Sequence, residues 1–503
     1  MSLIGIDVGT TGCKVLVLST DGQVIATAHR EYNVLRPQPG WAELDSAAVW
    51  GQIQDALHEA TAQTAGDPAV AVCVASMGEA MTPVSAERQI LGHCLLGFDT
   101  RGAETLARLA ALDPVTFFNH SGNIPSGVYG GPKLIWLRDH RPELFERAYK
   151  FLFWADLVSF LLGGEPVTDY ALANRSLFLD VQAETWSAQT LDYVGMPADK
   201  LPALAPAGTA IGTVSKEAAQ ATGLPAGATL VVGTHDQCAT ALGAGGIRPG
   251  MGVYGLGTYA CLTPIYDHFP PAQRMIAAGL SVEHHAVPAL YVSFYYNLTG
   301  GALLKWFRDT FAALEHAQAR AHGEDVYDHL LAEMPAAPTD LLVLPQFAPT
   351  GPPRFDEHPY GIIAGLSLET TRGEFVKGLL EGVTYYFREG LEHLAAAGIT
   401  IGEYRATGGG ARSDAWLQIT ADILGKPLAR PRITEAGALG AAILAGLGAG
   451  VFASVGEAVE ALVRVERVYT PDAGRHQFYE EKFNRYRHLY PYSQVLQGVT
   501  PAL

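Results

Sequence analysis

The chain has 503 residues, of which 48% are hydrophobic and 17% are charged, and its formal net charge is −17. This length and apolar content predict several folded domains and exclude a disordered chain. The negative charge disfavours nucleic acid or an anionic membrane as the main partner. The five cysteines are scattered without CxxC spacing, which is typical of a protein in a reducing cytoplasm.

The first half of the chain predicts a sheet with helices. Residues 3–28 alternate short apolar runs with glycine turns, which indicates antiparallel strands. Ser46 to Thr64 predicts a capped amphipathic helix, and Ala69 to Ser76 a buried strand. Leu230 to Gly233 predicts another buried strand that delivers Asp236 at its carboxyl end, where open α/β sheets bind ligands.

The second half repeats this kind of pattern after a glycine-rich hinge at Gly243 to Gly252. A strand, a glycine turn and a returning strand are expected next, followed by a helix from Gly301. A long amphipathic helix is expected from Thr371 to about Ala396. The stretch from Ala436 to Val455 lacks charged side chains apart from its flanks, but it is broken by glycines, so a buried helix is favoured over a membrane span.

Two glycine turns with threonines suggest a phosphate site. The first glycine loop is Gly9–Gly12 and the second is Gly255–Thr258. Glycine lets backbone N–H groups converge on an anion, and threonine adds a hydroxyl donor. Each loop alone is also compatible with a plain hairpin turn. Asp236 precedes the second loop and is a candidate general base, although an aspartate after a strand is also typical of a helix N-cap.

Eight motifs, in order along nearly the whole chain, resemble those of the FGGY family of carbohydrate kinases, and of its xylulose kinases in particular. They are Gly5-Ile6-Asp7-Val8-Gly9-Thr10-Thr11, Pro39 to Asp45, Val167 to Asn174, His235-Asp236-Gln237, Leu256-Gly257-Thr258, Gly365 to Gly382, Gly408 to Ser413, and Glu435 to Ala442. Each motif is weak alone, whereas their order and spacing together are specific.

The resemblance implies an α/β fold with two ribonuclease H-like domains of the actin-like ATPase type and a cleft between them. We expect an N-terminal domain over residues 1–245, a C-terminal domain over 246–465 and a C-terminal helical extension over 466–503. It also implies a cytoplasmic protein, with no nucleic-acid or membrane partner, that forms a homodimer.

The resemblance further implies binding of ATP and Mg²⁺. The residues expected to contact ATP are Gly9, Thr10, Thr11, Lys14, Gly257, Thr258, Gly301, Gly409, Gly410 and Ser413. Asp7 and Asp236 are expected to hold Mg²⁺, at least in part through water, because magnesium keeps much of its hydration shell.

The acceptor site is expected at Glu79, Asp99, Arg101 and Gln237, which offer the fixed hydrogen-bond partners that polyols need. Here the chain departs from its relatives. Xylulose kinases carry Met-His-Gly where this chain has Gly78-Glu79-Ala80, and glycerol kinases carry Arg-Glu-Thr. The tryptophan that relatives place four residues before Arg101 is Gly97. Asp99 and Arg101 are also compatible with a surface ion pair.

These residues predict a kinase that transfers the γ-phosphate of Mg-ATP to a terminal hydroxyl of a small, xylulose-like ketose or polyol, with Asp236 as the base. The alternatives are a polyol kinase for glycerol, erythritol or a pentitol, and a non-sugar ATPase of the actin/Hsp70 superfold. A P-loop kinase is excluded because no GxxxxGK[ST] motif occurs.

Overall fold

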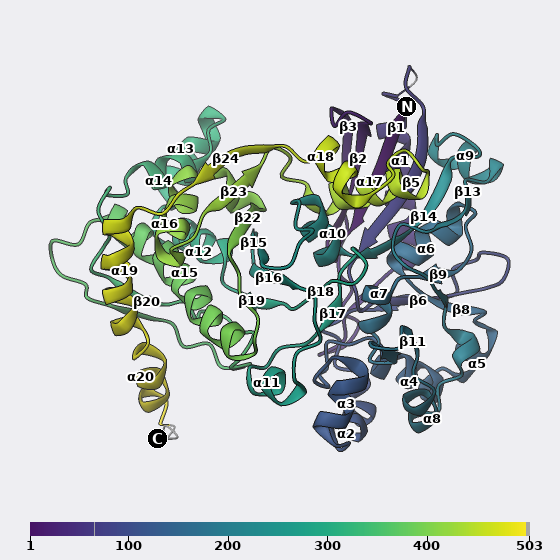
Figure 1. Ribbon diagram of the computed structural model, residues 1–503, viewed down its shortest axis with the longest axis horizontal. Coiled ribbons are helices and arrows are strands. Elements are labelled where there is room, and N and C mark those ends of the chain that lie inside the picture. Colours follow the sequence, from purple (N-terminus) through teal and green to yellow (C-terminus); the bar gives the residue numbers. More distant parts are fainter. Residues whose placement is uncertain (65, 499–503) are drawn as a thin grey trace.

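The computed structural model describes residues 1–64 and 66–498, and its first half is built on a six-stranded sheet (Figure 1). The order is β13-β14-β5-β1-β2-β3, with β1 and β2 antiparallel and β1, β5 and β14 parallel. The bounds are Ser2–Val8 for β1, Gly12–Ser19 for β2, Val24–Glu31 for β3, Ala69–Ser76 for β5, Ala210–Thr213 for β13 and Thr229–His235 for β14. The predicted antiparallel strands and both predicted buried strands are confirmed.

Helix α1 (Ser46–Thr61) covers this sheet and confirms the first predicted helix. Its N-cap is Asp45, whose carboxylate accepts hydrogen bonds from the N–H groups of Ala47 and Ala48. The buried Val49, Ile53 and Leu57 lie on one stripe. The predicted end at Thr64 is three residues too late.

The second half is built on an eight-stranded sheet, in which β17-β18-β16-β15-β22-β23-β24 are neighbours and β19 pairs with β16. The central strands are β15 (Met251–Leu256), β16 (Ala260–Tyr266), β22 (Glu403–Thr407) and β23 (Leu428–Pro431). The short strands are β17 (Glu283–His284), β18 (Tyr291–Val292) and β19 (Tyr295–Asn297). Helices α12 (Gly301–Phe311), α15 (Arg372–Ala396) and α16 (Asp414–Leu424) belong to this half, so the helices predicted from Gly301 and Thr371 are confirmed.

The expected helical extension over 466–503 needs one correction. Residues Val465–Tyr469 form β24, which pairs with β23 at the edge of the second sheet. In its sequence, VERVY, the charged Glu466 and Arg467 lie between two valines, and the first four residues are exposed, which suits an edge strand. The helices α19 (Ala473–Tyr486) and α20 (Leu489–Leu496) follow it.

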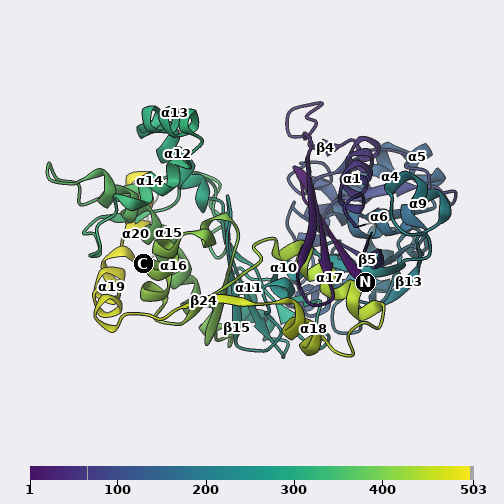
Figure 2. The ribbon, with the colours of Figure 1, turned by 90° about the horizontal axis from the view of Figure 1, so that it is seen from above.

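Two helices and an apolar core join the halves. Helix α10 (Asp236–Gly243) leaves the first sheet, whereas α17 (Ala436–Gly448) belongs to the far end of the sequence but packs on β1, β5 and β14 (Figure 1). One buried cluster contains Leu16 and Val231 of the first sheet, both helices, and Val253 and Ile265 of the second. Figure 2 shows α10 and α17 between the two halves.

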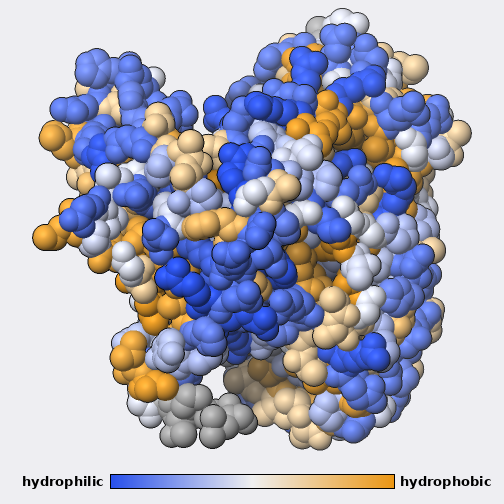
Figure 3. All heavy atoms as spheres, turned by 60° about the vertical axis from the view of Figure 1, so that its left-hand side comes forward, coloured by the Kyte–Doolittle hydropathy of each residue, from blue (hydrophilic) through white to orange (hydrophobic). Residues whose placement is uncertain are grey.

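Small residues let α10 and α17 touch backbone to backbone. A Cβ atom on Gly440 would overlap the carbonyl oxygen of Ala239, and one on Gly243 would overlap that of Ala436. The predicted buried helix in residues 436–455 is therefore confirmed, although it ends at Gly448. Within residues 1–64 and 66–498, no helix is long and apolar enough to span a membrane. Hydrophilic residues predominate on the face shown in Figure 3, with apolar residues in separate patches.

Candidate functional site

The first glycine loop is the turn between β1 and β2. The N–H of Gly9 donates to the carbonyl oxygen of Gly12 (2.9 Å), and the Tyr32 hydroxyl donates to the carbonyl oxygen of Gly9 (2.5 Å). Thr11 is exposed and Thr10 partly so. The turn is therefore held from behind, while its threonines remain open to a ligand. Lys14 forms an ion pair with Glu435, the residue before α17.

The second glycine loop is held by the start of α12. The N–H of Gly301 donates to the carbonyl oxygen of Gly257 (2.8 Å), and the N–H of Ala302 to that of Thr258 (3.0 Å). A Cβ atom on Gly301 would lie 2.9 Å from the carbonyl oxygen of Gly257, so glycine is required for this close approach. Thr258 is exposed, as a phosphate-binding hydroxyl must be.

The third glycine turn, after β22, packs against the second glycine loop. Gly408 has a φ of 83°, and a Cβ atom on Gly410 would lie 2.9 Å from Cβ of Leu256. Nothing lies within 4 Å of a Cβ placed on Gly409, so its backbone faces open space. Ser413 caps α16 by accepting from the N–H of Trp416. The structure therefore brings Gly257, Thr258, Gly301, Gly409 and Gly410 to one region of the second half.

Asp7 and Asp236 are carboxylates at the ends of neighbouring elements, β1 and α10. Burial, and then the nearby Asp236, raise the pKa of Asp7 to about 7. Burial also raises the pKa of Asp236, whose side chain keeps 25% of its surface exposed. A Cβ atom on Gly437 would overlap Oδ2 of Asp7, so only glycine at this position leaves room for the carboxylate. Two close carboxylates with raised pKa values fit a divalent cation that prefers oxygen ligands.

His235 joins Asp236 to a carboxylate of the second half. Its Nδ1 lies 2.6 Å from Oε1 of Glu283, and its Nε2 lies 3.2 Å from Oδ1 of Asp236. Burial alone would lower the pKa of His235, but Glu283 and Asp236 raise it to about 9. The ring is therefore a cation, hydrogen-bonded to Glu283 through Nδ1 and paired electrostatically with Asp236 through Nε2.

Glu79 is held by Arg175. Nε of Arg175 donates to Oε1 of Glu79 (2.9 Å), and Nη2 reaches the same oxygen. Nη1 of Arg175 lies 3.3 Å from Oε2 of Glu283. Burial opposes ionisation of Glu79, but Arg175 and His235 lower its pKa. Glu79 keeps 17% of its side chain exposed, so it can still accept a hydrogen bond from a ligand. The Gln237 side chain lies close enough to Asp236 to oppose the rise of its pKa.

Asp99 and Arg101 lie in a different environment from the one expected. Asp99 is fully buried and accepts hydrogen bonds from the N–H of Ala42 (2.6 Å) and from Nε of Arg101 (2.9 Å). Arg101 also pairs with Glu43 (2.7 Å), and its guanidinium lies 3.9 Å from the ring centre of Trp41. Their polar atoms are engaged in this buried cluster. No hydrogen bond or ion pair among residues 1–64 and 66–498 joins them to Glu79 or Asp236. Their role in the acceptor site stays a prediction, and both would have to bind a ligand while keeping these pairings.

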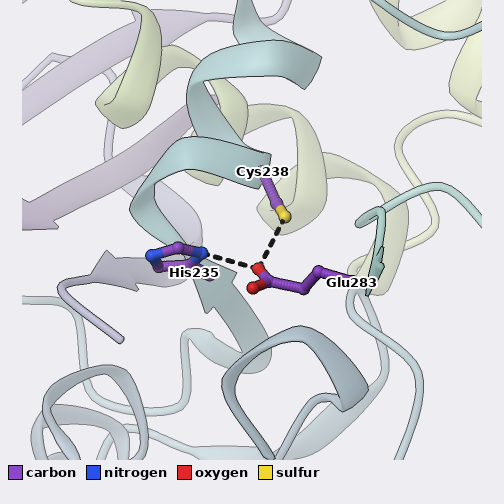
Figure 4. A group of neighbouring side chains, drawn as sticks. All are labelled: His235, Cys238 and Glu283. Carbon is purple, nitrogen blue, oxygen red and sulfur yellow. Dashed lines mark hydrogen bonds and ion pairs between the residues drawn. The ribbon is translucent and has the colours of Figure 1, made fainter. Parts of the chain in front are cut away.

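His235, Cys238 and Glu283 have the composition of a metal site, and Figure 4 shows their side chains turned toward one another. The Nδ1 of His235 and the Sγ of Cys238 both lie against Oε1 of Glu283, at 2.6 and 3.4 Å. With bonds of about 2 Å at tetrahedral angles, zinc holds its ligand atoms roughly 3.3 Å apart, whereas the 2.6 Å between Nδ1 of His235 and Oε1 of Glu283 is a hydrogen-bond distance. The cluster is a hydrogen-bonded group.

Arg175 and Glu283 were missed by sequence reasoning, as was any role for His235. Arg175 directly follows the Val167–Asn174 motif and His235 directly precedes the predicted base. Their positions next to recognised motif residues could therefore have indicated that both belong to the site. No local pattern marks Glu283, because it comes from a two-residue strand that crosses to the first half.

Comparison with known proteins identifies the class. Residues 2–243 match the N-terminal domain of the FGGY family of carbohydrate kinases, and residues 272–449 match its C-terminal domain. The chain belongs to the FGGY family of carbohydrate kinases and has the two-domain actin-like ATPase fold. It is therefore a phosphotransferase with an alcohol acceptor.

Two curated relatives and one solved structure show the similarity in detail. The chain is 26% identical over 496 residues to the xylulose kinase of Bacillus subtilis, covering 98% of this chain and 97% of that one. It is 29% identical over 506 residues to the autoinducer-2 kinase of Escherichia coli K12, covering 97% and 94%. The crystal structure of xylulose kinase from Rhodospirillum rubrum superposes with a TM-score of 0.86 at 30% identity, covering 99% of each chain.

Proposed function

We propose that the protein transfers the γ-phosphate of Mg-ATP to a terminal hydroxyl of a small ketose or polyol, with Asp236 as the general base. The observation that carries this proposal is the position of Asp236. Its carboxylate is close enough to interact electrostatically with Asp7 beside the first glycine loop and with Glu79 on the opposite, acceptor side. A base belongs between the phosphate donor and the acceptor hydroxyl.

In this proposal Asp236 accepts the proton of the acceptor hydroxyl as its oxygen attacks the γ-phosphate, a role that typically contributes about 10²–10⁴-fold. His235 holds one oxygen of Asp236, and the raised pKa of Asp236 suits it to take up a proton. N–H groups and threonines of the two glycine loops bind and orient the phosphates. Asp7 and Asp236 would hold Mg²⁺, which neutralises charge on the phosphates.

The acceptor is the finer part of the proposal. Two relatives are named xylulose kinase and autoinducer-2 kinase, and we propose a xylulose-like acceptor bound by Glu79 and Gln237. A polyol kinase for glycerol, erythritol or a pentitol is the second candidate, because this chain has Glu79 and the Asp236-Gln237 pair as glycerol kinases do. A homodimer, a cytoplasmic location and the domain limits at 245 and 465 stay predictions.

An ADP-release assay with Mg-ATP across ketoses, polyols and sugar acids tests the proposal. We expect one class of acceptor, xylulose-like, to stimulate ADP release strongly. Slow release that no acceptor stimulates would favour the non-sugar ATPase and would contradict the proposed function.

We expect Glu79→Ala to raise the KM for the acceptor about 10- to 100-fold, because a hydrogen bond to a charged group contributes roughly 1.5–3 kcal/mol. The KM for ATP should stay nearly constant. Glu217→Ala, which changes an exposed carboxylate on α9 (Lys216–Thr222) in the same half, is the control and should change neither value. Equal increases in both KM values would remove Glu79 from the acceptor site.

A further inference from the structure

A fully buried carboxylate of the second half lies against the acceptor side of the first half. Glu283 belongs to β17, and its side chain has no exposed surface. Its two oxygens have different partners: Oε1 accepts from Nδ1 of His235 (2.6 Å) and Oε2 from Nη1 of Arg175 (3.3 Å). One carboxylate thus holds two cations, which satisfies the pairing that a buried charge requires.

Each of these cations holds a second carboxylate that is partly open. His235 reaches Asp236, which is 25% exposed, and Arg175 reaches Glu79, which is 17% exposed. We propose that Glu283 is a positioning residue for phosphoryl transfer: it fixes the base Asp236 through His235 and the acceptor ligand Glu79 through Arg175. The inference rests on the proposed function and adds to it the residue that fixes the distance between the carboxylates of Asp236 and Glu79.

Gly78 supports this arrangement. A Cβ atom there would lie 2.6 Å from Cγ of Arg175 and 3.0 Å from Cδ2 of His235. Any side chain at position 78 would therefore displace one of the two cations. Glycerol kinases carry an arginine at this position, and its replacement here has a physical reason, because Arg175 and His235 occupy the space that Gly78 leaves free.

β17 is tied to the first half independently of Glu283. The N–H of Val282 donates to the carbonyl oxygen of Gly122 (2.7 Å), and Nε2 of His284 lies 2.7 Å from the carbonyl oxygen of Val181. The backbone on both sides of Glu283 is therefore anchored, as a positioning residue requires.

The variant Glu283→Gln weakens the pairing of residue 283 with His235 and Arg175 while changing its side-chain volume little. An amide has one acceptor oxygen where the carboxylate has two, so either His235 or Arg175 must lose its partner. We expect kcat/KM for the acceptor to fall on the order of 10- to 100-fold, because misplacement of a reacting group by about 1 Å can cost this much. The KM for ATP should remain nearly unchanged, since the side-chain hydrogen bonds of Glu283 within the described residues go to His235, Cys238 and Arg175 and not to the glycine loops.

The matched control is Glu381→Gln on α15. Glu381 is also fully buried and pairs with a buried cation, Lys482 (2.5 Å), but within the second half. This variant should lower stability and leave acceptor kinetics unchanged. If both variants lower acceptor kcat/KM to the same degree, Glu283 has only a structural role and the proposal is wrong.

Crystal structures of the wild type and Glu283→Gln give a readout that needs no turnover. We expect Asp236 or Glu79 to move away from its cation in the variant. If both carboxylates keep their positions, the positioning role is overturned even where the acceptor is known. If no acceptor stimulates the wild type, the proposed function fails, while the two structures still decide whether Glu283 positions these carboxylates.

Discussion

The Asp236→Asn variant should transfer phosphate about 10²–10⁴ times more slowly than the wild type, while its affinity for ATP stays largely intact. Asparagine has nearly the same shape, so it can still begin α10 and keep a side-chain oxygen beside His235. It cannot accept the proton of an acceptor hydroxyl. Single-turnover transfer to the best acceptor, together with direct measurement of ATP binding, checks both parts of the expectation.

Asp169→Asn is the matched control for this variant. Asp169 is a buried carboxylate of the same half, and burial raises its pKa to about 7. It accepts from the N–H of Leu172 and from the Thr234 hydroxyl, as the N-cap of α7 (Tyr170–Asn174). Asparagine is also a good N-cap, so transfer should remain close to wild type. Near-normal turnover by Asp236→Asn would remove the base from the mechanism.

Gly440→Ala should lower the free energy of unfolding by about 3 kcal/mol or more, at the upper end of overpacking effects. The new methyl group would overlap the carbonyl oxygen of Ala239, at the place where α10 and α17 touch. Neither backbone can move easily, because α17 also packs on β1, β5 and β14. Urea unfolding followed by circular dichroism measures the difference from the wild type.

Gly51→Ala is the control because Gly51 lies inside α1 with nothing within 4 Å of an added Cβ. Alanine is favoured over glycine within a helix by roughly 0.5–1 kcal/mol, so this variant should be neutral or more stable. Equal destabilisation by the two substitutions would mean that the contact between α10 and α17 is not tight in solution.

Much of the fold followed from local sequence patterns. Apolar runs such as Ala69–Ser76 and Leu230 to Gly233 predict buried strands, and the structure places them in β5 and β14; glycine turns mark the loops between strands. Edge elements were harder to predict, because β24 has two adjacent charged residues and a mostly exposed surface, and it pairs with a strand more than 30 residues away in the sequence. The packing of α17 on the first sheet is likewise a long-range tertiary contact that local patterns do not predict.

The candidate site shows the same division. The glycine turns could be located because tight turns need particular residues at short spacing, and Asp236 could be placed because it follows a buried apolar strand; the roles proposed for them stay predictions. Glu283 and Arg175 act across 108 residues of sequence, and no periodicity reports such a contact. Asp99 and Arg101 are residue types that can bind a polyol, but sequence spacing alone does not reveal that they are buried in a cluster with Trp41.

The cluster that joins the two sheets also bears on how the chain folds. Because α17 covers the face of β1, β5 and β14, residues 1–245 expressed alone would leave that apolar face without its cover. The two halves thus match separate domains by sequence similarity, but the first half depends on the second to cover its sheet. The apolar face of the first sheet is buried only when residues 436–448 pack on it. Because these residues are synthesised late, we expect this face to stay exposed on a ribosome-bound chain until translation is nearly complete.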